Sequence, residues 1–126
     1  MLRLDAAALD AHARRCDDVA DRIAARNLAM QGLLDHVVAL HVRSTWDSPT
    51  ATERRRALKS RRDDFEAVRS DLASLAVQLR ARAEADRLEA RTLVRRAEAI
   101  EAAARLEAIE AQQHRVDELT SPTGPR

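Results

Sequence analysis

The chain is poor in the residues that end helices and in those that fill a thick core. Among its 126 residues are two glycines, three prolines, one tryptophan, one phenylalanine and no tyrosine. Pro49 is the first proline, and no further glycine or proline occurs until Pro122. Long windows therefore lack a strong helix breaker. Because alanine supplies much of the 45% apolar content, these absences predict long, thin helices in a single domain.

Other absences exclude whole classes of protein. A single cysteine excludes an intrachain disulfide. No segment approaches the roughly 20 apolar residues that span a bilayer, and charged residues interrupt the first 15, so we expect neither membrane insertion nor a cleaved signal peptide. A net charge of +1, from 22 basic and 21 acidic residues, gives no overall attraction to nucleic acids or membranes. We therefore expect a cytoplasmic protein, or one exported without a cleaved leader.

A seven-residue apolar repeat runs through the first 40 residues. Its members are Leu2, Leu9, Cys16, Ile23, Met30 and Val37, with Ala13, Val19, Ala20, Leu33, Leu34 and Leu40 between them. This spacing predicts one amphipathic helix over about residues 5–44, with Asp5 as its N-cap. Asn27 falls on the same stripe, where it either fixes the register of the helices or remains a partly exposed polar residue.

The repeat resumes after Pro49 and predicts a second helix over about residues 50–118. Its members are Leu58, Phe65, Leu72 and Leu79, supported by Val68, Leu75, Ala76 and Ala83. The pattern weakens at Asp86, resumes at Ala90 and shifts phase near Leu106. Ser48 can cap this helix because Pro49 suits its first position. The last residues, 119–126, have no periodicity, and we expect them to be disordered.

The short predicted loop, residues 45–49, determines the expected fold. Helices joined by so few residues are usually antiparallel neighbours, so we expect an all-α helical hairpin domain over residues 1–118 with an extended second helix. Two helices leave part of each apolar stripe uncovered, which favours dimerisation into a four-helix bundle. The expected helix–helix and partner interface consists of Leu9, Cys16, Ile23, Met30, Val37, Leu58, Phe65, Leu72 and Leu79.

The loop residues Trp46, Asp47 and Ser48, the opening LRLDAAALDAHARR and the flanking heptads resemble a known family. It is the Trp-X-Gly family of small type VII secretion substrates, the Esx-like proteins of actinobacteria and firmicutes. The resemblance covers about residues 2–88, and richness in arginine and alanine is typical of an actinobacterial genome. The resemblance implies that Trp46 lies at the hairpin bend and packs across to a partner subunit.

Two departures from the family pattern refine the expected function. Ser48 stands where the motif has glycine, and the chain has no tyrosine for the Tyr-x-x-x-Asp/Glu export signal. His114 and Glu118 reproduce only the spacing and the acidic half of that signal. The resemblance therefore implies a non-catalytic partner of another hairpin, or of the helical N-terminal region of a secreted effector, as co-secreted protein or targeting helper. The alternative is a homodimeric coiled-coil scaffold unrelated to secretion.

Two local clusters offer other functions that the sequence favours less. The basic run ERRRALKSRR, residues 53–62, could contact phosphates, but an acidic segment follows at once and no groove-reading motif accompanies it. His12 and Cys16 lie four residues apart and could share a metal ion. No second pair has ligand spacing, however, and Cys16 on the apolar stripe can act as a small hydrophobe. We expect no metal, cofactor, catalytic residue or nucleic-acid partner.

Overall fold

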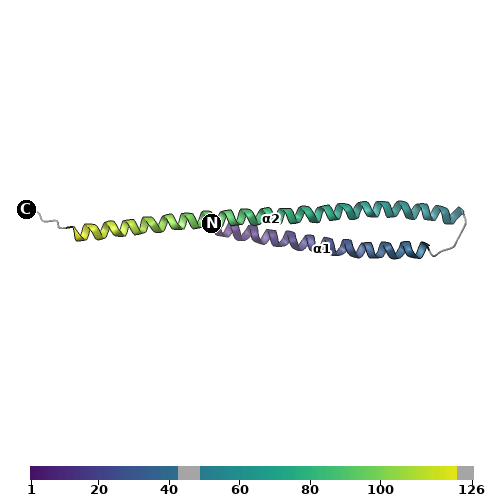
Figure 1. Cartoon of the computed structure of the whole chain (residues 1–126), viewed down its shortest axis with the longest axis horizontal. Coiled ribbons are helices and arrows are strands. Elements are labelled where there is room, and N and C mark those ends of the chain that lie inside the picture. Colours follow the sequence, from purple (N-terminus) through teal and green to yellow (C-terminus); the bar gives the residue numbers. More distant parts are fainter. Residues whose placement is uncertain (43–48, 122–126) are drawn as a thin grey trace, which may run out of the picture.

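The computed structural model of the protein describes residues 1–42 and 49–121, except for the side chains of residues 41 and 42. Two helices form this part of the chain: α1, Leu2–Val42, with 41 residues, and α2, Pro49–Thr120, with 72 residues. They run side by side in opposite directions (Figure 1). The expected all-α hairpin with an extended second helix is confirmed, and the described ranges contain no strand.

The helix ends lie close to those expected. α1 begins at Leu2 rather than near residue 5, and α2 begins at Pro49, where a fixed φ and a missing N–H cost nothing. α2 continues to Thr120, just past the expected end near residue 118. The first helix-stopping residue is Pro122, which disfavours helical geometry only at the residue before it. Trp46, Asp47 and Ser48 lie outside the described residues.

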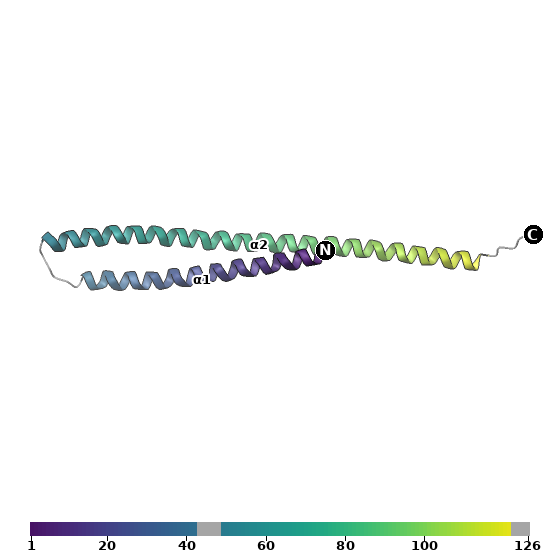
Figure 2. The same ribbon diagram turned by 180° about the vertical axis from the view of Figure 1, so that it is seen from behind.

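α2 projects well beyond α1. At about 1.5 Å per residue, α1 is roughly 60 Å long and α2 roughly 110 Å, and the N-terminus of α1 lies part-way along α2 (Figure 2). Arg3 marks this level, because its Nε and Nη2 donate to the two Glu101 carboxylate oxygens, both at 3.0 Å. These bonds lower the pKa of Glu101 and raise that of Arg3. Beyond Glu101, residues 102–120 form an exposed overhang of a single helix.

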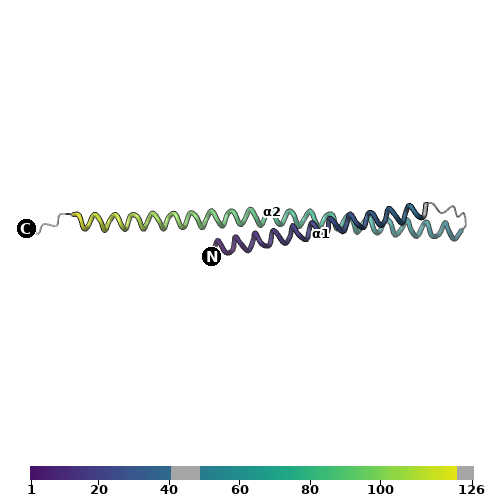
Figure 3. The backbone as a smooth tube through the Cα atoms, turned by 90° about the horizontal axis from the view of Figure 1, so that it is seen from below, coloured from purple at the N-terminus to yellow at the C-terminus, as the bar shows by residue number. Residues whose placement is uncertain are grey.

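The core of the hairpin is a seam of alanines. The most deeply buried apolar residues are Ala6, Ala13, Cys16 and Ala20 of α1, and Ala76, Ala83, Ala90 and Ala97 of α2. The alanines of each helix recur every seven residues, which keeps them on the face toward the other helix. Figure 3 shows α1 crossing α2 at a shallow angle in projection. Alanine side chains let two helices approach closely, so this seam is tight and thin.

The large residues expected at the interface flank the alanines or lie nearer the loop. Cys16 is buried, Val37 is exposed, and the others are half-buried: Leu9, Ile23, Met30, Leu58, Phe65, Leu72 and Leu79. Asn27 also faces α2, where its Oδ1 accepts from Arg69 Nε at 3.0 Å and its Nδ2 donates to the Arg69 carbonyl at 3.2 Å. These bonds support the register-fixing interpretation of Asn27, because a shift along the seam would break both of them.

We predict that Ala83→Leu lowers the free energy of unfolding of the hairpin by about 1–3 kcal/mol. The larger side chain at this fully buried contact would force the helices apart. Ala83 is 0% exposed and touches the cluster of Ala13, Cys16 and Leu79. The matched control is Ala81→Leu, at an exposed position of the same helix, which should change stability by less than about 0.5 kcal/mol. Urea unfolding followed by circular dichroism measures both variants. Equal stability of the two would contradict the tight seam.

Candidate functional site

A buried carboxylate lies beside the alanine seam, at a position of the leucine repeat that flanks it. Asp86 of α2 occupies the heptad position that holds Leu79 one repeat earlier and Leu93 one repeat later, and it is 1% exposed. Its Oδ2 lies 2.5 Å from His12 Nδ1 of α1. An ionisable group at a core position costs free energy unless it is paired or ligated. Packing between the helices therefore does not explain why an aspartate stands at this core position.

His12, Cys16 and Asp86 form a compact polar cluster, here called the seam trio. Cys16 lies one helical turn after His12, with its Sγ 3.9 Å from both ring nitrogens. Ala13, Ala83 and Leu79 form the apolar side of this site, while the His12 side chain, 46% exposed, opens it to solvent. One ligand atom from each of the three residues lies within 4.8 Å of the other two.

The two carboxylate oxygens of Asp86 have different surroundings. Oδ2 faces His12, whereas Oδ1 lies 3.1 Å from Arg82 Nε, four residues earlier on the same helix. That contact has the distance of an ion pair but not the alignment of a hydrogen bond, and the buried Oδ1 has no hydrogen-bond partner among the described residues. Arg82 itself is mostly exposed. Oδ1 therefore keeps unused acceptor capacity inside the seam.

Two ion pairs cross between the helices near the seam trio. Arg87 donates to Asp17 across the helices and to Glu84 at 2.8 Å along α2, and both hydrogen bonds raise the pKa of Arg87. Arg80 reaches Asp21 at 3.1 Å. These ion pairs are partly exposed, so they contribute little to the free energy of unfolding and act mainly on the alignment of the helices. Both pairs form in the same alignment that brings residues 12 and 86 together.

Imidazole nitrogen, thiolate sulfur and carboxylate oxygen are the three donor types of protein zinc sites. The sequence analysis paired His12 with Cys16 but missed Asp86, which lies 74 residues after His12. Only the antiparallel pairing of the helices brings the third donor to the first two. One signal was available in the sequence, because an aspartate stands where the heptad predicts leucine.

A second candidate site is an apolar stripe on the outside of α2, here called the outer stripe. Its residues are Val77, Leu88, Leu106, Ile109 and Val116, all exposed. At about 100° per residue, Val77, Leu88 and Leu106 lie within roughly 20° of one another and more than 100° from Ala83 and Ala90. Val77 and Leu88 therefore face away from α1. On the overhang, Ile109 and Val116 lie roughly 60–80° round the helix from Leu106, so the stripe is broader there.

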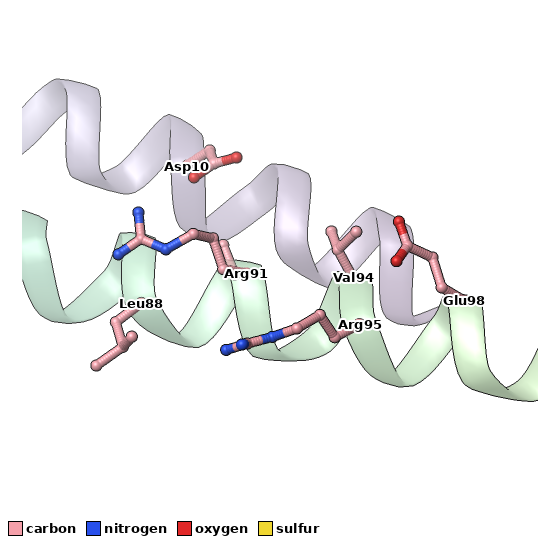
Figure 4. A pocket seen from close by; sticks show the side chains of 7 residues that line it. Asp10, Leu88, Arg91, Val94, Arg95 and Glu98 are labelled. Carbon is pink, nitrogen blue, oxygen red and sulfur yellow. The ribbon is translucent and has the colours of Figure 1, made fainter.

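An open hollow lined partly by charged side chains lies between the two helices. It has a volume of about 460 Å³ and is lined by Asp10 of α1 and by Leu88, Ala90, Arg91, Val94, Arg95 and Glu98 of α2 (Figure 4). Its lining side chains include two acids, Asp10 and Glu98, and two arginines, Arg91 and Arg95. The basic residues Arg54, Arg56, Lys59, Arg61 and Arg62 are all exposed at the other end of α2.

Neither described helix is long and apolar enough to cross a membrane. Comparisons with protein-family models, curated proteins and solved structures found no match for this chain. The resemblance to the Trp-X-Gly family therefore stays a prediction, and the function has to be argued from the seam trio and the outer stripe.

We predict that Asp86→Leu raises the free energy of unfolding by about 1–3 kcal/mol in the presence of a metal chelator. The change replaces a buried charge with the apolar residue of the neighbouring heptads, which removes the desolvation cost of the carboxylate. Half-exposed His12 can turn to solvent. Thermal unfolding measures the change, with Asp71→Leu at an exposed position of α2 as the matched control. A lower melting temperature for Asp86→Leu than for the parent would show that the carboxylate stabilises the metal-free seam.

Proposed function

We propose that the protein is a non-catalytic helical module that binds another helical protein along the outer stripe. The observation that carries this proposal is the exposure of large apolar side chains on a face that α1 does not cover. Leu88 is 56% exposed, and Leu106 and Ile109 are each 61% exposed. Full burial of one such side chain contributes about 1.5–3 kcal/mol. A partner helix laid along the stripe would bury several of them together.

The thin seam supports the same conclusion. Seven of the eight buried apolar residues in the described part of the chain are alanines, so the two helices bury little apolar area between them. Small domains with small cores are often stabilised by oligomerisation. A four-helix bundle, in which a second pair of helices covers the outer stripe, would supply the apolar burial that the isolated hairpin lacks.

We further propose that this pairing serves type VII secretion. The support is the Trp46-Asp47-Ser48 sequence between two antiparallel helices, which resembles the Trp-X-Gly hairpin. The partner is then another small hairpin or the helical N-terminal region of a secreted effector. Because the chain has no tyrosine, it takes the role of the subunit without the Tyr-x-x-x-Asp/Glu signal, and its partner carries that signal.

The overhang favours a second candidate, a homodimeric scaffold. Residues 102–120 extend beyond α1 and carry Leu106, Ile109 and Val116 of the outer stripe. Two copies in opposite directions could pair these segments as an antiparallel coiled coil. In that case the protein associates with itself and needs no secretion partner.

We predict that the double variant Leu106→Arg/Ile109→Arg weakens association at least tenfold, because two charges would be buried in the new interface. The matched control is Ala108→Arg/Ala111→Arg, with the same added charge and the same spacing on another face of the overhang. Sedimentation equilibrium measures self-association, and capture from the native host followed by mass spectrometry measures partner binding. Circular dichroism should show unchanged helix content. Equal association by both variants would reject the outer stripe as the interface.

We predict that the cytosolic complex purified from the host contains a second helical protein ending in Tyr-x-x-x-Asp/Glu, and that both proteins occur in the culture medium. Mass spectrometry of the tagged complex and of the medium tests this. Trp46→Ala should weaken that complex while leaving the helix content largely unchanged. Recovery of the chain alone, with none in the medium, would exclude the secretion role and leave the homodimeric scaffold.

A further inference from the structure

We propose that His12, Cys16 and Asp86 bind one Zn²⁺ ion between α1 and α2. The ligands are one ring nitrogen of His12, the Cys16 thiolate and one Asp86 carboxylate oxygen. Solvent takes the fourth position, through the opening beside half-exposed His12. This site is separate from the outer stripe and does not depend on which partner the hairpin binds.

The distances suit a tetrahedral ion after small side-chain movements. With Zn–N near 2.0 Å and Zn–S near 2.3 Å, neighbouring donor atoms lie about 3.5 Å apart. Cys16 Sγ is 3.9 Å from both His12 Nδ1 and His12 Nε2, which is close to this spacing. His12 Nδ1 and Asp86 Oδ2, now 2.5 Å apart, must separate by roughly 0.5–1 Å. His12 has the freedom to do so because nearly half of its side chain is exposed.

Burial and charge also favour a cation at this point. Asp86 is 1% exposed, and its Oδ1 has no hydrogen-bond partner among the described residues. A buried carboxylate costs free energy unless it is paired or ligated, and an ion bound to either of its oxygens would offset part of that cost. A thiolate and a carboxylate together carry two negative charges, so a divalent cation with a neutral imidazole makes the site electrically neutral. Arg82 is mostly exposed and can leave Oδ1 for solvent.

A purely structural role for Asp86 leaves part of the seam trio unexplained. If Asp86 served only to fix the register, one polar partner on α1 would suffice, as Asn27 and Arg69 illustrate nearer the loop. Here α1 places a nitrogen and a sulfur one turn apart, each within 4.8 Å of the same carboxylate. Helical bundles commonly build metal sites from side chains on facing helices. Thiolate and imidazole donors select Zn²⁺ over Mg²⁺ or Ca²⁺.

Titration of the full-length, reduced and chelator-treated protein tests the proposal. We expect calorimetry to show one Zn²⁺ per chain, and saturating Zn²⁺ to raise the melting temperature by about 5 °C or more, because an ion that binds only the folded state stabilises it. Mg²⁺ at the same concentration should have no effect. Co²⁺, as a spectroscopic probe, should give the visible absorption of a tetrahedral ion and a near-ultraviolet thiolate-to-cobalt charge-transfer band.

Variants identify the ligands. His12→Ala, Cys16→Ser and Asp86→Asn should each lower Zn²⁺ affinity at least tenfold, and Cys16→Ser should also abolish the charge-transfer band. The control is His114→Ala, which removes an exposed histidine paired at 3.4 Å with Glu118 four residues on and should leave affinity unchanged. If a variant fails to fold, the Co²⁺ spectrum of the parent protein decides. Absence of binding, one ion per two chains, a spectrum without the thiolate band, or equal affinity in all folded variants would overturn the proposal.

Discussion

Two helices can lie close together over many turns only where their facing side chains are small, and alanines at seven-residue spacing meet that condition here. Ala13 and Ala83 are fully buried, and the other seam alanines lie on the same face of each helix. The remaining features of the hairpin follow from this contact. It places residues 12 and 86 side by side, it leaves the outer stripe of α2 uncovered, and it keeps the apolar area buried between the helices small.

Because the seam is thin, binding of an ion or of a partner protein would raise the stability of the hairpin. Large side chains such as Phe65 and Leu72 are half-buried nearer the loop, whereas the part of the seam around Asp86 is lined by alanine. A cation held by the seam trio would stabilise that alanine-lined part directly, since two of its ligands come from α1 and one from α2. A partner on the outer stripe would act from the opposite side of α2. The two proposed sites therefore stabilise different faces of one long helix.

The sequence predicted the architecture well because its heptads are long and its breakers are few. Pro49 separates two uninterrupted apolar repeats, so the helices, their direction and the overhang could be derived from spacing alone. The same reasoning assigned the interface to large residues such as Leu9 and Leu58, while the structure buries Ala6 and Ala90 more deeply. Reasoning from residue size favours large side chains at the interface. The distance between the helix axes, however, decides which side chains are buried.

By itself the sequence determined an all-α hairpin with an overhanging second helix, since helix periodicity and helix breakers are local properties of the chain. It also placed His12 and Cys16 on one face of the first helix. Only the tertiary structure decided that Asp86 completes this pair, because the exact alignment of two antiparallel helices sets which residues meet across the seam. That alignment depends on contacts between distant residues, such as Asn27 with Arg69 and Arg3 with Glu101, which spacing along the chain does not reveal.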